Sequence, residues 1–167
     1  GPGVVRRANE AFQKGIQGLA ANRLSRVFLT HLHSDHTLGL PDVILTPWVL
    51  ERREPLQVFG PPGTRRMVEC ILESFSEDIR ERRLGLQPSD DSGLAVKVTE
   101  LDRDTSICLH GIDVDAFTVN HGSMICFGYR FSAGGRTIAI SGDTAPFEGM
   151  EEAYGGCDIL LHEVYST

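Results

Sequence analysis

The chain of 167 residues contains no long hydrophobic run. Its longest apolar stretches are as short as residues 43–45 and 159–161, whereas a helix that spans a bilayer needs roughly 20 apolar residues. The sequence opens Gly1-Pro2-Gly3 with no apolar segment behind it, so no signal peptide is visible. These features predict a cytoplasmic protein without contact to a membrane.

The chain also lacks an excess of basic residues. It has 16 Lys and Arg against 23 Asp and Glu, which gives a net charge of −7. A protein that coats nucleic acid needs a basic face, so only a local basic patch is compatible with this balance. Arginines cluster at residues 52–53, 65–66 and 80–83. We expect solvated helix faces paired with neighbouring glutamates, and the alternative is a rim that attracts a phosphorylated or sulfated substrate.

Closely spaced cysteine pairs are missing as well. The four cysteines are Cys70, Cys108, Cys126 and Cys157, and their spacing contains neither a C-x-x-C redox pair nor a zinc ribbon. They are therefore expected to be buried, reduced thiols, and the alternative is a disulfide between cysteines that are distant in the sequence. Hydrophobic residues make up 41% of the chain and charged residues 23%, which is typical of one globular domain.

Hydrophobic periodicity and turn residues predict interleaved helices and strands, and thus an α+β protein. Helices are expected at residues 4–20, at 36–52 with breaks at Pro41 and Pro47, from an N-cap at Thr64 to about residue 83, and at 146–154. Strands are expected at residues 26–30, 56–60, 94–101, 105–110, 112–120, 125–131, 136–141 and, as a buried strand, 157–164. Residues 85–93 are expected to form a loop, and residues 133–135 a hairpin turn.

The most informative segment is His31-x-His33-x-Asp35-His36. It places three imidazoles and one carboxylate within six residues, although the whole chain has only 6 histidines. Histidine and aspartate are suitable ligands for divalent zinc, manganese or iron. A loop that leaves a strand can direct His31 and His33 toward one ion, and Asp35 with His36 toward a second. Two neighbouring ions share a bridging hydroxide, which is a strong nucleophile at neutral pH.

Two further candidate ligands follow predicted strands. His121 comes after the strand at 112–120, and Asp143 comes after the strand at 136–141. Functional groups gather at strand ends in mixed folds, so both are expected to join the first motif.

These residues resemble the metallo-β-lactamase fold superfamily, and within it the ribonuclease Z-like and arylsulfatase-like branch. The resemblance covers nearly the whole chain. It is carried, in the order of the family, by the segments Thr30-His31-Leu32-His33-Ser34-Asp35-His36, Gly60-Pro61-Pro62-Gly63, His121, Phe127-Gly128-Tyr129-Arg130, Ser141-Gly142-Asp143-Thr144 and His162-Glu163-Val164-Tyr165.

The resemblance implies an αββα sandwich, in which two β-sheets pack face to face with helices outside. It implies that one zinc ion is held by His31, His33 and His121. It implies that a second is held by Asp35 and His36, with Asp143 bridging both ions. Glu163 matches a glutamate that helps to orient a proton-donating histidine, so Asp35 and Glu163 are the expected catalytic residues.

The function implied is that of a binuclear zinc hydrolase whose metal-bound hydroxide attacks a phosphodiester, either an RNA 3′ end or a small anionic ester. Alternatives are an arylsulfatase, another ester hydrolase such as a lactonase or thioesterase, and a non-catalytic metal-binding scaffold. Manganese or iron could replace zinc, and a homodimer is expected from the resemblance.

The family pattern extends beyond both ends of this sequence. The relatives have a strand before the first residues, and after the His-Glu motif they have a proton-donating histidine and a last metal ligand. Residues 1–167 are therefore expected to be a single but incomplete domain. Members that process transfer RNA also insert a long Gly-rich arm after the Gly-Tyr-Arg strand, where this chain has only the turn at residues 133–135.

Overall fold

A computed structural model describes residues 1–85 and 90–164. The N-terminal half contains the helices α1 (Val4–Gln13), α2 (Ser34–Thr37), α3 (Leu40–Val49), α4 (Thr64–Ser74) and α5 (Ser76–Leu84), and the strands β1 (Arg26–Phe28), β2 (Leu56–Gly60) and β3 (Val96–Glu100). Short 3-10 turns lie at Gln17–Leu19, Ala21–Arg23 and Asp91–Gly93. The C-terminal half contains the strands β4 (Thr105–Leu109), β5 (Ile112–Thr118), β6 (Phe127–Ala133), β7 (Arg136–Ile140) and β8 (Ile159–Leu161), and the helix α6 (Met150–Tyr154).

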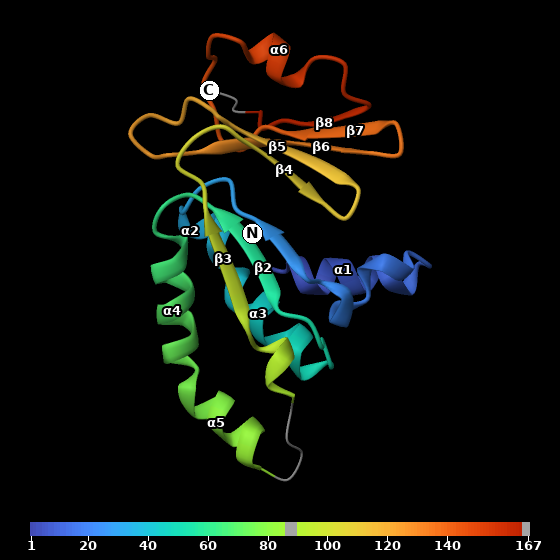
Figure 1. Ribbon diagram of the computed structural model, residues 1–167, viewed down its shortest axis with the longest axis vertical. Helices are drawn as coiled ribbons and strands as arrows, with labels where there is room; N and C mark the ends of the chain where they lie inside the picture. Colours follow the sequence, from blue (N-terminus) through green and yellow to red (C-terminus); the bar gives the residue numbers. More distant parts are fainter. Residues whose placement is uncertain (86–89, 165–167) are drawn as a thin grey trace.

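The strands form two sheets. The first is wholly parallel, in the order β1-β2-β3. The second has the order β4-β5-β6-β7-β8 and is antiparallel except for the β7–β8 pair. Figure 1 shows the two sheets as inner layers, with α6 beyond the second sheet and α1, α3 and α4 around the first. This arrangement confirms the αββα sandwich.

Alternating side chains of the first sheet pack on opposite faces, one against the helices and the other against the second sheet. On β2, Val58 packs into a cluster with helix residues such as Val43 and Val68, while Phe59 faces the second sheet. Phe28 stacks on Phe59 with ring centroids 4.7 Å apart and meets Tyr129 of β6 edge-on at 5.4 Å. Aromatic packing therefore fixes the spacing of the sheets and aligns the strand ends that carry the site.

Several predicted boundaries are wrong for local reasons. The first helix ends at Gln13 and not at residue 20, because Gly15 takes a φ of 100° that leaves the helix. The helix after Thr64 is divided at Phe75 into α4 and α5. Gly63 rather than Thr64 is the N-cap, and the Thr64 hydroxyl donates to the Pro61 carbonyl.

The expectation of a buried strand at residues 157–164 is also wrong. Only Ile159–Leu161 forms β8, and its side chains are about half exposed. Within the described residues β8 lies at the margin of the second sheet and pairs only with β7, so one of its edges and both of its faces have few neighbours. Of the expected loop at 85–93, residues 86–89 fall outside the described part.

The predicted break at Pro47 does not occur, since α3 continues through this residue. Pro47 has no N–H to give to the Val43 carbonyl. Arg52 supplies the missing donor. Its side chain is 1% exposed and donates to the main-chain carbonyls of Leu24, Val43, Ile44 and Gly93. The prediction that Arg52 lies on a solvated face is therefore wrong.

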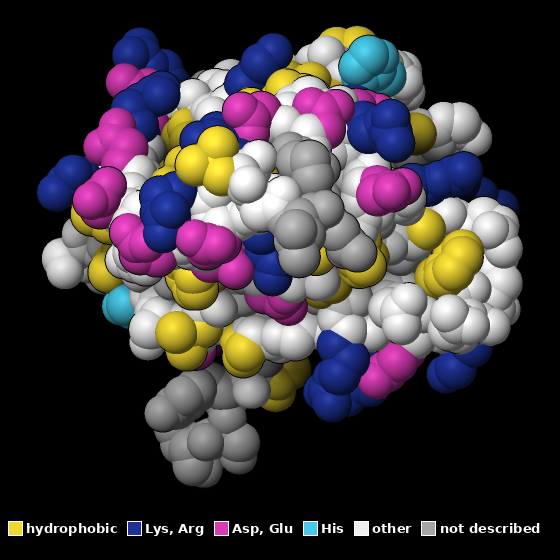
Figure 2. All heavy atoms as spheres, turned by 90° about the horizontal axis from the view of Figure 1, so that it is seen from below, with side chains coloured by type: hydrophobic (Ala, Val, Ile, Leu, Met, Phe, Trp, Pro, Cys, Tyr) yellow, Lys and Arg dark blue, Asp and Glu magenta, His cyan; other side chains and the backbone are white. Residues whose placement is uncertain are grey.

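The expected pairing is seen in the cluster at residues 80–83 and at Arg66, which lies 3.7 Å from Glu69, whereas the Arg65 side chain donates to the Val98 carbonyl. Arg80 lies within 3.0 Å of both Glu77 and Glu81, and Arg82 pairs with Asp78. Figure 2 shows basic and acidic side chains intermingled on the face seen from below. The described part of the chain has no helix with the length and apolar character needed to cross a membrane.

Candidate metal centre

The predicted ligands meet at one end of the two sheets. His31 follows β1, and the next turn leads into α2, which carries Asp35 and His36. His121 lies three residues after the end of β5, and Asp143 lies three residues after the end of β7. The site is therefore built from loops of both sheets, as strand-end placement predicts.

The first group of candidate ligands consists of three imidazoles. The Nε2 of His31 lies 3.0 Å from the Nδ1 of His33, and the Nε2 of His121 lies 3.2 Å from the same atom. These three nitrogens can face a single ion. The residues predicted for the first metal are thus brought together.

The second group contains His31, His36 and Asp143. One carboxylate oxygen of Asp143 lies 3.3 Å from the Nε2 of His36, and the other lies 3.9 Å from the Nε2 of His31. The two oxygens of Asp143 thus face different imidazoles, which suits a carboxylate placed between two ions. Asp35 approaches from outside: its carboxylate is 3.4 Å from the His36 Nε2, and its side chain is 76% exposed.

The protonation state of His31 suits a ligand. This residue is fully buried, and burial, followed by the charge of the nearby His36, lowers the pKa of His31 to about 4. At neutral pH the ring is therefore uncharged and keeps a lone pair, as metal binding requires. Four imidazoles with carboxylates at their margin form a donor set that fits zinc, manganese or iron.

Two residues behind His31 were missed by sequence reasoning. The Thr30 hydroxyl lies 3.1 Å from the Nδ1 of His31, and the Cys126 thiol lies 3.6 Å from the same atom. Both residues contact the Nδ1 of His31, so its Nε2 is the ring nitrogen that faces the other candidate ligands. Thr30 directly precedes the metal motif, which was a usable signal, whereas nothing in the sequence links Cys126 to His31.

Glu163 lies behind Asp143 and not among the converging ligand atoms. Its carboxylate accepts the backbone N–H of Thr144, and its own N–H donates to the Ser141 hydroxyl at 3.1 Å. Asp143 and Glu163 also line a hollow of about 410 Å³, together with Thr30 and His36. This hollow adjoins the second ligand group and offers space for a substrate.

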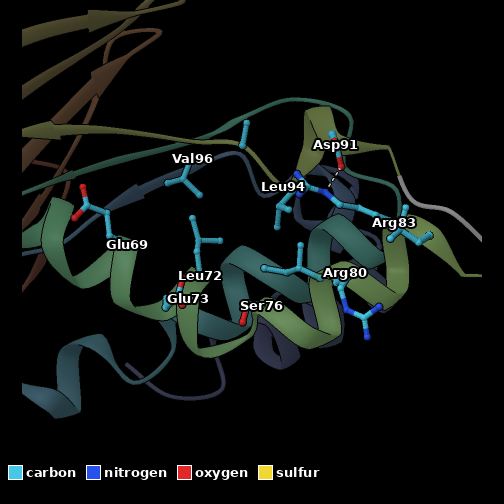
Figure 3. A pocket seen from close by; sticks show the side chains of 12 residues that line it. Glu69, Leu72, Glu73, Ser76, Arg80, Arg83, Asp91, Leu94 and Val96 are labelled. Carbon is cyan, nitrogen blue, oxygen red and sulfur yellow. Dashed lines mark hydrogen bonds and ion pairs between the residues drawn. The ribbon is translucent and has the colours of Figure 1, made fainter.

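A larger hollow of about 920 Å³ lies among α4, α5 and β3. Figure 3 shows Leu72, Leu94 and Val96 in its wall, with Arg83 joined to Asp91 at its rim. None of the predicted metal ligands lines it.

His110 does not join either ligand group. It occupies the turn between β4 and β5 with a φ of 52°, although the sequence predicted a strand there.

The family profile described as "Beta-lactamase superfamily domain" matches residues 1–167. A ribonuclease Z of Mycobacterium bovis is 32% identical over 168 residues, which cover 98% of this chain and 58% of the relative. The ribonuclease Z of Mycolicibacterium gilvum is 34% identical over 171 residues and is covered to 56%. This chain therefore spans less than two thirds of these relatives.

The solved structure of the short form of human tRNase Z matches with a TM-score of 0.66 and 23% identity, covering 91% of this chain and 61% of that one. At this identity the likeness concerns the fold. The whole-length family match, the two face-to-face sheets and the converging ligand loops agree with one another. The chain therefore belongs to the beta-lactamase superfamily and has the metallo-β-lactamase fold.

Proposed function

We propose that this protein is a metal-dependent hydrolase that cleaves a phosphodiester bond. The observation that carries the proposal is that two ligand groups share His31, and that the Asp143 carboxylate of the second group lies between His36 and His31. The ribonuclease Z relatives support phosphodiester chemistry.

In this proposal His31, His33 and His121 would hold one ion, and Asp35, His36 and Asp143 would provide the ligands of a second. Zinc is the favoured metal, and manganese or iron are alternatives. When bound, such ions supply Lewis-acid stabilisation of negative charge and an activated water at neutral pH.

The chain's own residues prepare this site in three ways. Thr30 and Cys126 hold the His31 ring from behind, so that its Nε2 faces the cluster. Asp35 is exposed beside His36, where it can contact an incoming ester or the water that attacks it. The resemblance implies that Glu163 supports a proton-donating histidine, and Glu163 also bonds to both Thr144 and Ser141 beside Asp143.

The connection between β6 and β7 bears on which ester this protein would cleave. In transfer-RNA-processing members the resemblance implies an arm between the strands that correspond to β6 and β7. Here β6 and β7 are joined through Gly134 and Gly135, which have φ values of 56° and 74° and form a tight hairpin. This connection favours a small phosphodiester over a clamped RNA, and arylsulfatase activity is the alternative within the same reaction class.

The test is turnover by the zinc-loaded protein on bis(p-nitrophenyl) phosphate, p-nitrophenyl sulfate and an RNA with a 3′ extension. We expect hydrolysis of the phosphodiester and its loss in His33→Ala, because this change removes a ligand of the first group. Hydrolysis of the sulfate alone would replace the proposal with an arylsulfatase. Zinc binding without turnover of any substrate would favour the non-catalytic scaffold.

A further inference from the structure

Asp143 lies on a turn whose backbone packs closely against the first residue of β6. Gly142 has a φ of 65°, and a Cβ atom built there would lie 2.8 Å from the Phe127 carbonyl. The turn therefore presses its backbone against the start of β6, where only glycine fits. The position of the Asp143 carboxylate consequently depends on the two residues that flank the Gly142-Asp143 pair, Ser141 and Thr144.

Both flanking residues are bonded to the segment that carries Glu163. The Thr144 N–H donates to the Glu163 carboxylate, and the Glu163 N–H donates to the Ser141 hydroxyl at 3.1 Å. The Ser141 N–H donates to the Leu161 carbonyl at 2.9 Å. Glu163 thus contacts the turn at two points. Its carboxylate binds Thr144, which follows Asp143 in the sequence, and its backbone N–H binds Ser141, which precedes Gly142.

The opposite side of the turn is bonded to the loop that carries His121. The Asn120 N–H donates to the Thr144 hydroxyl at 3.2 Å, and the Ala145 N–H donates to the Asn120 carbonyl at 2.8 Å. Thr144 is therefore the residue where the contact from Glu163 and the contact from the His121 loop meet. A shift of Thr144 would move Asp143 relative to His121.

We propose that Glu163 is a positioning residue, which fixes the Asp143 carboxylate between His36 and His31 by accepting the Thr144 N–H. This inference rests on the metal site of the proposed function but differs from the proton-donor support that the resemblance implies. Accepting an N–H needs an oxygen atom but no negative charge. Support of a proton donor needs the charged carboxylate. The two roles therefore respond differently to the same pair of substitutions.

The experiment compares Glu163→Gln and Glu163→Ala. Zinc affinity is measured without substrate, by competition with a chromophoric chelator, and the exchange rate of the Thr144 amide is measured by NMR. Glutamine keeps the acceptor oxygen, so we expect Glu163→Gln to retain zinc affinity within about threefold. Alanine removes it, so we expect zinc affinity to fall by about 10–100-fold and Thr144 exchange to accelerate.

Glu148→Ala is the matched control, since Glu148 is an exposed glutamate on the connection between β7 and α6, and it should leave both measurements unchanged. If Glu163→Ala fails to fold, Ser141→Ala removes the other half of the contact and should also weaken zinc binding. Unchanged zinc affinity in Glu163→Ala, or an equal loss in Glu163→Gln, would overturn the positioning role. Failure of the proposed hydrolase is distinguishable, because it would appear as zinc binding by the unaltered protein without turnover.

Discussion

The Arg52 guanidinium donates a hydrogen bond of 2.8 Å to the carbonyl of Val43, the acceptor that Pro47 leaves without an intrahelical partner. The same guanidinium also bonds to the carbonyls of Leu24, Ile44 and Gly93. One buried cation therefore joins α3 to the chain before β1 and to the turn before β3. The helix α3 can therefore contain Pro47, because the Arg52 side chain supplies the hydrogen-bond donor that proline lacks.

Replacement of Arg52 by alanine should lower the free energy of unfolding by about 3–5 kcal/mol, since several buried carbonyls lose their donors together. Adding Pro47→Ala restores an N–H at position 47. The double variant should then recover about 1 kcal/mol beyond the sum of the single changes. Urea unfolding measures both effects. Arg53→Ala is the control, because Arg53 is exposed, and a loss as large as that of Arg52→Ala would contradict this account.

Removal of one imidazole should disable the first ligand group. In His121→Ala we expect zinc affinity to fall by at least about 100-fold, because affinity follows the number and geometry of ligands. Elemental analysis and chelator competition measure the effect. The matched control is His110→Asn, since His110 lies in a turn with positive φ and asparagine tolerates that conformation. Equal loss in both variants would show that zinc binds elsewhere.

The four cysteines should react with a thiol reagent at different rates, because they differ in exposure. Cys70 and Cys108 are exposed, so they should react rapidly with Ellman's reagent in the native protein. Burial raises the pKa of the Cys126 thiol to about 11, so this residue should react only after unfolding. Cys157 is intermediate in exposure and should react between these limits. Rapid labelling of Cys126 in a Cys70→Ser, Cys108→Ser variant would contradict the packing around His31.

Alkaline pH should weaken the packing of α6 on the second sheet. Burial, followed by the nearby Cys126, raises the pKa of Tyr154 to about 12, whereas an unfolded tyrosine titrates near 10. The folded state holds the proton more tightly, so the stabilisation is complete below about pH 10 and is lost as pH rises toward 12. The loss should amount to roughly 1–2 kcal/mol, somewhat less than the full linkage of two pKa units.

Urea unfolding between pH 9 and pH 11.5 measures this slope, with phenolate absorbance at 295 nm as the titration signal. Tyr154→Phe should flatten the slope. Tyr129 remains as an internal comparison, since burial also raises its pKa. An unchanged slope in Tyr154→Phe would assign the alkaline transition to another group.

The sequence predicted which candidate ligands lie close together better than it predicted the bounds of the helices. The short-range motif from His31 to His36 fixes its own geometry, because a strand end and one helical turn position all four side chains. His121 and Asp143 were placed through their positions after strands. What could not be predicted depends on long-range contacts: the burial of Arg52, the continuation of α3 through Pro47, and the contact of Cys126 with His31. The expectation that all cysteines are buried was wrong for Cys70 on α4 and for Cys108 on β4, because both residues are exposed to solvent.

The candidate ligands come from both layers of the sandwich, and this has a mechanical consequence. His31, His33 and His36 follow the first sheet, whereas His121 and Asp143 follow strands of the second. An ion held by both sets would join the two sheets, and because the unfolded chain has no preformed site, its binding would stabilise the folded state alone. Metal occupancy and cohesion of the two sheets are therefore thermodynamically linked, and a chelator should loosen the interface between Phe28 and Tyr129 as well as empty the site.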